Sequence, residues 1–210
     1  MANLQRQTRS QVTRAAFLEA AISLLNDEST GDLSMPGVAQ AAGKSVGALY
    51  EHFGSKDALL AAVGEAYVAR RDAFLNETFA EARWSESTRV ERVDGFVRSF
   101  AEWYRQNRGV LRLVILRAWS TETQPSEASV EGFRRNIRFV GRFIVGSRFE
   151  ELTPAQARAT ENGVHYAIIL ARDALVIDDA TQQILEAGAP SHLEEDLIEI
   201  VNGFLDRIPS

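Results

Sequence analysis

The chain has 210 residues, of which 45% are apolar and 25% charged, and these proportions are typical of a globular protein with one or two domains. It contains no cysteine, which excludes disulfides, thiolate metal sites and cysteine nucleophiles. The net charge is −6, and no apolar run reaches the length of a membrane span. Because the N-terminus also lacks the apolar core of a secretory signal, we expect a cytoplasmic protein.

The N-terminal quarter of the chain differs in charge from the rest. Residues 1–56 carry equal numbers of basic and acidic side chains, so the remaining residues account for the whole net charge of −6. No acidic side chain precedes Glu19, which leaves Arg6, Arg9 and Arg14 unopposed. An acidic protein that has a local basic surface can still bind the phosphates of DNA. Residues 1–9 are predicted to form a mobile arm.

Three helices are predicted in the N-terminal region, near 10–26, 34–41 and 45–52. The second and third each follow a candidate N-cap, Ser34 or Ser45, whose hydroxyl can accept a hydrogen bond from a free first-turn amide. Gly43 lies between them and permits a tight turn. Two helices joined in this way form a helix-turn-helix, whose second helix can enter a major groove of DNA.

Polar side chains on and beside the third helix indicate DNA binding. Tyr50, His52, Lys44 and Lys56 can hold phosphates through hydroxyl, imidazole or ammonium groups, although a purely structural capping role for His52 is also open. Small residues at the front of this helix allow it to approach base edges closely. The predicted DNA-binding residues are Ser34, Lys44, Ser45, Val46, Gly47, Ala48, Tyr50, His52 and Lys56.

This stretch resembles the DNA-binding domain of the TetR family of transcriptional regulators. The matching positions, in register, are Ser34, Ala42-Gly43, Ser45, Gly47, Tyr50, His52-Phe53, Ser55-Lys56-Asp57 and Leu59-Leu60. Lys44 departs from the family pattern, which usually has an apolar residue there. The resemblance covers roughly residues 12 to 62, and the remainder of the chain matches in length and helical texture.

The resemblance implies an architecture and a function. Residues 1–55 would form the helix-turn-helix domain, with the motif at about 34–53, and residues 56–210 an effector-binding and dimerisation domain. The expected protein is a repressor that binds a palindromic operator as a homodimer and responds to a small-molecule effector of unknown identity. Dimerisation is expected through helices near 154–177 and 191–208. No cofactor, metal or membrane is expected.

The rest of the chain has only helical periodicity, so the predicted fold class is all-α. Further helices are expected at about 56–83, 88–106, 108–119, 127–149, 154–177 and 191–208. Thr153-Pro154 is a typical helix start, an N-cap followed by proline at the first helical position. The long helix from Lys56 joins the DNA reader to everything after it, so any signal between the two parts is expected to pass through it.

Aromatic side chains in the second half form the candidate effector pocket. Periodicity alone favours a plain hydrophobic core, whereas the resemblance favours a cavity, in which Trp and Tyr would orient a guest through their polar tips. Arg117 lies two positions before Trp119 in the sequence, and we expect it to anchor an anionic group of the guest. The predicted ligand-binding residues are Phe96, Phe100, Trp103, Tyr104, Arg117, Trp119, Phe133, Ile137 and Tyr166.

Other chemistry has weaker support in the sequence. The arginine series of the helix near 127–149 is compatible with a nucleic-acid face, but a solvated face paired with acids is favoured. His165 and His192 lack metal-ligand spacing, and no nucleophile–base pair is visible, so the chain is not expected to be an enzyme. Two alternatives stay open: a helical carrier or enzyme with a vestigial DNA-binding module, and a regulator that activates transcription.

Overall fold

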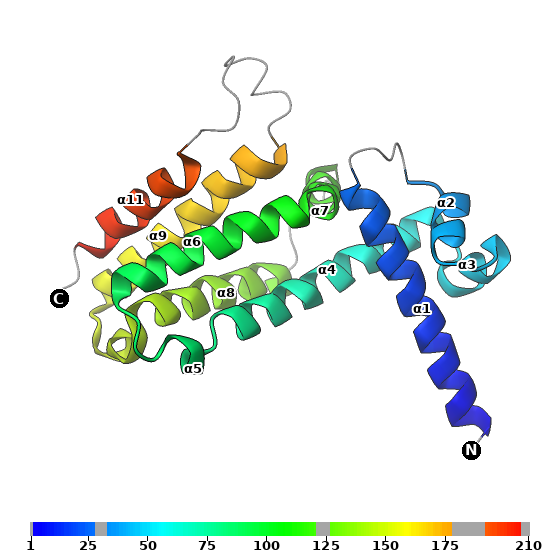
Figure 1. Cartoon of the computed structure of the whole chain (residues 1–210), viewed down its shortest axis with the longest axis horizontal. Coiled ribbons are helices and arrows are strands. Elements are labelled where there is room, and N and C mark those ends of the chain that lie inside the picture. The colour runs from blue at the N-terminus through cyan, green and yellow to red at the C-terminus, as the bar shows by residue number, and fades with distance from the viewer. Residues whose placement is uncertain (1, 28–32, 121–126, 178–191, 207–210) are drawn as a thin grey trace, which may run out of the picture. The chain divides into compact units, whose positions relative to one another are not determined.

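The computed structural model describes residues 2–27, 33–120, 127–177 and 192–206 (Figure 1). These residues form helices and turns, and no strand occurs among them, which confirms the predicted all-α class. No helix in these ranges combines the length and apolar character needed to cross a membrane. The chain divides into two compact units. Met1–Arg70 with Gly109–Leu116 forms the first, and Arg71–Arg108 with Arg117–Ser210 forms the second.

The first unit contains a three-helix module. Helix α1 spans Ala2–Asn26, α2 spans Met35–Ala41 and α3 spans Val46–Phe53. Its core contains Phe17, Val38 and Leu49, one from each helix, and all three side chains are fully buried. Helix α4 (Lys56–Thr78) begins in this unit and adds the buried Leu59. The module therefore contains the three helices predicted for the N-terminal region.

Part of helix α7 (Arg108–Ser120) belongs to the same unit, namely Gly109–Leu116. The backbone amide of Val110 donates a hydrogen bond to the Asn26 side-chain oxygen at 3.0 Å, so the last residue of α1 caps the start of α7. The approach is close, because a Cβ added at Gly109 would lie 1.7 Å from the Leu25 carbonyl oxygen. Only glycine fits at position 109.

The second unit is a bundle of longer helices. Helices α6 (Arg89–Gln106), α8 (Glu127–Val145), α9 (Pro154–Arg172) and α11 (Leu193–Leu205) lie side by side (Figure 1). The largest contact is between α9 and α11, where a Cβ added at Gly163 would lie 3.0 Å from the Phe204 Cβ. Thr153 and Gln156 form a reciprocal capping box at the start of α9, and Pro154 follows the cap as predicted.

The buried side chain of Arg92 stabilises the connection between α4 and α6 through hydrogen bonds. Arg92 of α6 donates to the Glu81 carboxylate of the short helix α5 (Glu81–Trp84) at 2.6 and 2.9 Å. It also donates to the carbonyls of Trp84 and Phe143, so its five N–H groups are well used despite burial. The Arg92 hydrogen bond lowers the pKa of Glu81 below its usual value.

Several predicted boundaries were wrong, each for a local reason. Residues 2–9 of the predicted mobile arm are instead the first part of α1, because no glycine or proline interrupts residues 2–26 and helix propagation adds one hydrogen bond per residue. The helix predicted at 56–83 ends at Thr78, since side chains of α5 take its last carbonyls: Trp84 Nε1 donates to the Thr78 oxygen at 2.8 Å.

Two C-terminal helices are also shorter than predicted. The helix predicted at 127–149 ends at Val145, because Gly146 takes a left-handed φ of 69° and starts a 3₁₀ segment, Gly146–Glu151. The helix predicted at 154–177 changes to a π-helical turn at Asp173–Ile177. The predicted ends of the last helix at 191 and 207–208 lie outside the described residues.

Candidate nucleic-acid interface and ligand pockets

Helix α3 presents an exposed face that carries most of the predicted DNA-binding residues. Val46 and Tyr50 are 37% and 49% exposed, one helical turn apart, and Gly47 lies beside Val46 on the same face. Ala48 is half-buried, and Leu49 and Phe53 pack into the core. The helix therefore separates a buried apolar side from an exposed side that combines small, apolar and hydroxyl groups.

The turn before α3 holds that face in a defined orientation. The amide of Gly43 donates to the Gln40 carbonyl at 3.0 Å, and the amide of Lys44 donates to the Ala39 carbonyl at 2.9 Å. This pair of bonds is a Schellman motif, and Gly43 supplies the left-handed residue that it requires, with φ of 63°. Lys44 is exposed directly before α3.

Serine caps fix the starts of three consecutive helices. The hydroxyl oxygens of Ser34, Ser45 and Ser55 accept from the amides of Gly37, Ala48 and Ala58 at 3.1–3.2 Å. Each cap satisfies one of the amides that a helix start leaves free. Lys56 is exposed at the first position of α4, where the remaining free amides favour an anion.

His52 has a structural contact in addition to its predicted DNA role. It is half-buried, and its ring lies 5.8 Å from the Phe17 ring of α1. The Arg14 guanidinium of α1 stands over the Phe53 ring at 5.0 Å, so α1 and α3 are joined by aromatic and cation–π contacts. The side chain of Arg6 is not described, and Arg9 is exposed.

These features define the N-terminal part of the chain as a helix-turn-helix DNA-binding domain of a transcription regulator. Residues 17–63 match the sequence model of the bacterial regulatory proteins of the tetR family. The N-terminal region is therefore a TetR-family DNA-binding domain, which confirms the resemblance found in its sequence. No curated protein matches it significantly.

Solved structures extend the similarity of fold to nearly the whole chain. A TetR transcriptional regulator from Rhodococcus sp. RHA1 is 19% identical with a TM-score of 0.53, and the match covers 95% of this chain and 99% of that one. A TetR transcription regulator from Haloarcula marismortui ATCC 43049 is 19% identical with a TM-score of 0.58, covering 94% and 98%. At this identity the likeness establishes the fold.

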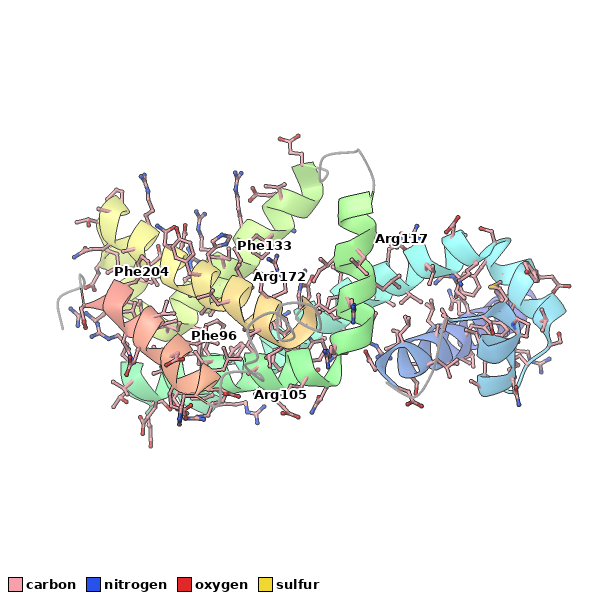
Figure 2. All side chains as sticks on the ribbon, turned by 90° about the horizontal axis from the view of Figure 1, so that it is seen from above. Phe96, Arg105, Arg117, Phe133, Arg172 and Phe204 are labelled. Carbon is pink, nitrogen blue, oxygen red and sulfur yellow. The ribbon has the colours of Figure 1, made fainter. Side chains whose placement is uncertain are left out.

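The predicted ligand-binding residues lie in several separate environments. Phe96, Phe100 and Tyr104 are buried along α6 and pack edge to face, with ring centroids 5.2 Å apart in each successive pair. Trp103 stacks on Phe74 of α4 at 4.5 Å. Tyr166 is 46% exposed on α9. Figure 2 places Arg117 on α7 and Phe133 on α8, and the side chain of Trp119 lies outside the described part.

Two hollows flank α8 in the second unit. The one between α8 and α9 has a volume of about 640 Å³, and its lining includes two of the predicted residues, Phe133 and Ile137. The one between α4 and α8 has a volume of about 380 Å³. Both volumes fall within the range of small-molecule sites, roughly 300–1,000 Å³.

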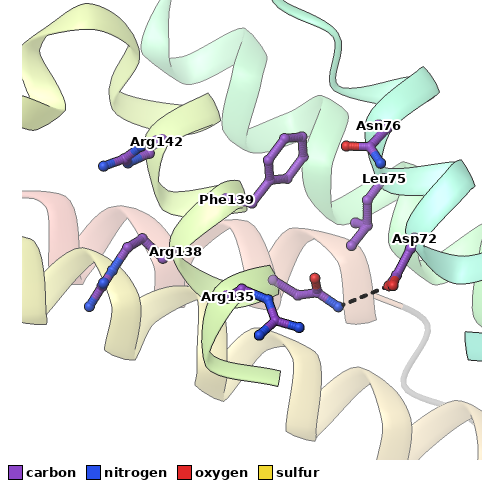
Figure 3. Close-up of a pocket in the computed structure, with 8 residues that line it drawn as sticks. Asp72, Leu75, Asn76, Arg135, Arg138, Phe139 and Arg142 are labelled. Carbon is purple, nitrogen blue, oxygen red and sulfur yellow. Dashed lines mark hydrogen bonds between the residues drawn. The ribbon is translucent and has the colours of Figure 1, made fainter. Parts of the chain in front are cut away.

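Sequence reasoning missed the lining of the α4/α8 hollow (Figure 3). The residues concerned are Asp72, Leu75, Asn76, Arg135, Asn136, Arg138, Phe139 and Arg142. The arginines are visible in the sequence as a series, but the acids available to pair with them favour a solvated face. No signal in the sequence paired them with Leu75 and Asn76, because the two helices are far apart along the chain.

Among the described residues, no group of three His, Asp or Glu side chains is arranged to hold a metal ion.

A surface feature of another kind is present on α9. Tyr166 and Leu170 are 46% and 44% exposed, one helical turn apart. The Tyr166 ring lies 5.6 Å from the Phe204 ring of α11, so the exposed apolar surface continues onto the neighbouring helix.

Proposed function

We propose that the chain is a homodimeric, ligand-responsive repressor that binds a palindromic operator in the cytoplasm. The observation that carries this proposal is the exposed face of α3, which is held by the Ser45 cap and the Gly43 turn and displays Val46 and Tyr50 to solvent. No cofactor, metal or catalytic step is part of the proposal.

The DNA contacts divide into positioning and reading. Tyr50, Lys56 and His52 hold phosphates through hydroxyl, ammonium and imidazole groups, and Ser34 and Ser45 hold the helix starts that approach the backbone. Val46 and Ala48 meet base edges, with Gly47 allowing close approach, and Lys44 contacts the groove from the turn. Positioning residues set affinity for every sequence, whereas reading residues set the preference among sequences.

The proposed dimer forms through α9 and α11. Exposed Tyr166 and Leu170 supply an apolar surface on α9, and a twofold axis would bring this surface against its own copy. Such a dimer presents two copies of α3. They match half-sites about 34–36 Å apart or a multiple of that distance, which requires an inverted repeat in the DNA.

The effector binds in the second unit beside α8, where the two hollows lie. It releases the operator only if it prefers the conformation that cannot bind DNA. Moving a population from nearly all competent to nearly all incompetent requires a preference of about 10⁴-fold, or about 5.5 kcal/mol. Helix α4 is the expected route, because it contributes residues to both units.

A pair of exposed valines tests the DNA-binding proposal. Val46 of α3 and Val68 of α4 are 37% and 39% exposed in the same unit, but only Val46 lies on the proposed DNA face. Operator fragments are first selected from a random duplex library with the purified chain. Val46→Ala should then change the selected sequence, and Val68→Ala should leave it unchanged.

Two results would contradict the proposal. The first is a selected sequence that is identical for the wild type and Val46→Ala. The second is the absence of any inverted repeat among the fragments bound by the wild-type protein.

A further inference from the structure

The arginine series of α8 is only partly explained as a solvated face. Three of its members have acidic partners within 4 Å: Arg134 with Glu131, Arg138 with Glu161 and Arg142 with Glu150. Arg135 is exposed, and it has no acidic partner among the side chains that the structure describes. Arg135 is therefore the one arginine of α8 that lacks an acidic partner among the described side chains.

Arg135 lines the hollow between α4 and α8, which also contains apolar surface (Figure 3). Leu75 of α4 is 3% exposed, and half-buried Phe139 of α8 lines the same hollow. Asn76 adds an amide at the α4 side. The hollow thus offers an apolar wall on each helix and cationic groups along one edge.

The charges of this hollow favour an anion. Arg135, Arg138 and Arg142 line it, against one carboxylate, Asp72. Asp72 is already engaged, because Arg71 pairs with it at 2.8 Å and the Asn136 amide donates to it at 3.3 Å. Each guanidinium has five donors, so the arginines that pair with glutamates retain N–H groups for a further acceptor.

We propose that the α4/α8 hollow binds an organic anion, a carboxylate or phosphate monoester on a short apolar chain. Arg135 receives the acidic head in a charge-assisted, two-point hydrogen bond, and Leu75 and Phe139 contact the chain. The inference rests on the proposed function, since it names the chemical class of the effector. A ligand here touches α4 directly, the helix that begins at Lys56 and contributes to both units.

Binding is measured by calorimetry on the full chain without DNA, using octanoate, octyl phosphate and octan-1-ol as probes. One or both anions should bind the wild-type protein, and octan-1-ol should bind far more weakly because it lacks the charge. Arg135→Gln should weaken binding of the anion roughly ten- to hundredfold, the range expected for losing a hydrogen-bonded charge. The preferred anion distinguishes a carboxylic acid from a phosphate monoester.

The neighbouring arginine supplies a matched control. Arg134 and Arg135 both line the α8/α9 hollow, but only Arg135 also lines the α4/α8 hollow, so the two variants differ at the proposed site. The nearest acid to Arg134 is Glu131, at 3.9 Å. Arg134→Gln removes the same charge from the same helix, so it should retain most of the wild-type affinity. Circular dichroism should give both variants the wild-type helix content and melting temperature, since both arginines are exposed.

Three results would overturn the proposal: no binding of either anion to the wild type, equal losses in the two variants, or octan-1-ol binding as tightly as the preferred anion. Operator affinity is then measured with and without the bound anion. If an anion binds through Arg135 and operator affinity does not change, the anion site stands and its proposed effector role fails. If operator binding is absent under every condition, the proposed function fails independently of the site.

Discussion

The two glycines around the start of α3 should respond to alanine in opposite directions. A Cβ at Gly43 would meet nothing within 4 Å, so its cost comes only from the left-handed φ of 63°. That conformation costs an L-residue about 1–2 kcal/mol, offset by about 0.4–1 kcal/mol because alanine restricts the unfolded chain. Gly43→Ala should therefore lower the free energy of unfolding by up to about 1.6 kcal/mol.

Gly47 is helical, and a Cβ there would have only the Ser45 hydroxyl at 4.0 Å as a neighbour. Gly47→Ala should raise the free energy of unfolding by up to about 1 kcal/mol, because alanine favours the helix. The same methyl group would stand on the face proposed to approach DNA. It should weaken operator binding by about 1–3 kcal/mol per half-site, as extra volume does in a closely packed contact.

Stability in the first unit is best measured by hydrogen exchange of the α2 and α3 amides. Tryptophan fluorescence would not report on it, because Trp84, Trp103 and Trp119 all belong to the second unit. Operator affinity is measured by fluorescence anisotropy. Equal exchange rates in Gly43→Ala and Gly47→Ala would contradict the predicted stability difference. Wild-type operator affinity in Gly47→Ala would contradict the close approach of this face to DNA.

Three further predictions concern other contacts. Lys56→Gln should reduce the slope of log affinity against log salt concentration by about 0.9 per half-site, because one phosphate contact is lost. An unchanged slope across a salt titration would exclude that contact. Gly109→Ala should lower the melting temperature markedly, at a cost of roughly 1–3 kcal/mol or more, because its Cβ would lie 1.7 Å from the Leu25 carbonyl oxygen; a wild-type melting curve would contradict this. The pKa of Glu81 is lowered by Arg92, so their pair stabilises the fold above the usual value of 4.5 and loses this contribution as the pH falls below it. The stability difference between the wild type and Glu81→Gln in urea should therefore shrink between pH 6 and pH 3, and a difference that grows would have the wrong sign.

The helix-turn-helix could be predicted to within about a residue at each end because its signals are local. Ser34 and Ser45 are caps in the sequence and in the structure, and Gly43 occupies the turn that both require. The end of α4 could not be predicted, because its last carbonyls are taken by side chains that follow the helix, including Trp84. The helical spacing of apolar residues in the sequence continues past the end of α4 without a visible break.

The second unit shows which features of a site lie beyond sequence reasoning. Arginine is rarely buried, yet Arg92 is 6% exposed and donates hydrogen bonds to Glu81 and to the carbonyl of Phe143. The α4/α8 hollow likewise depends on which residues of two distant segments face each other. Leu75 and Arg135 are unremarkable in the sequence, and only the packing of α4 against α8 brings them to one cavity.

Binding to inverted repeats of altered spacing tests the central claim, that two copies of α3 read one operator together. Purified protein is titrated into the selected operator and into a duplex with about half a helical turn, roughly five base pairs, inserted between the half-sites. We predict that the selected operator binds two chains, or a multiple of two, and that the insertion weakens binding strongly because it turns the half-sites to different faces. Equal affinity for both duplexes, or one chain bound per operator, would contradict the account.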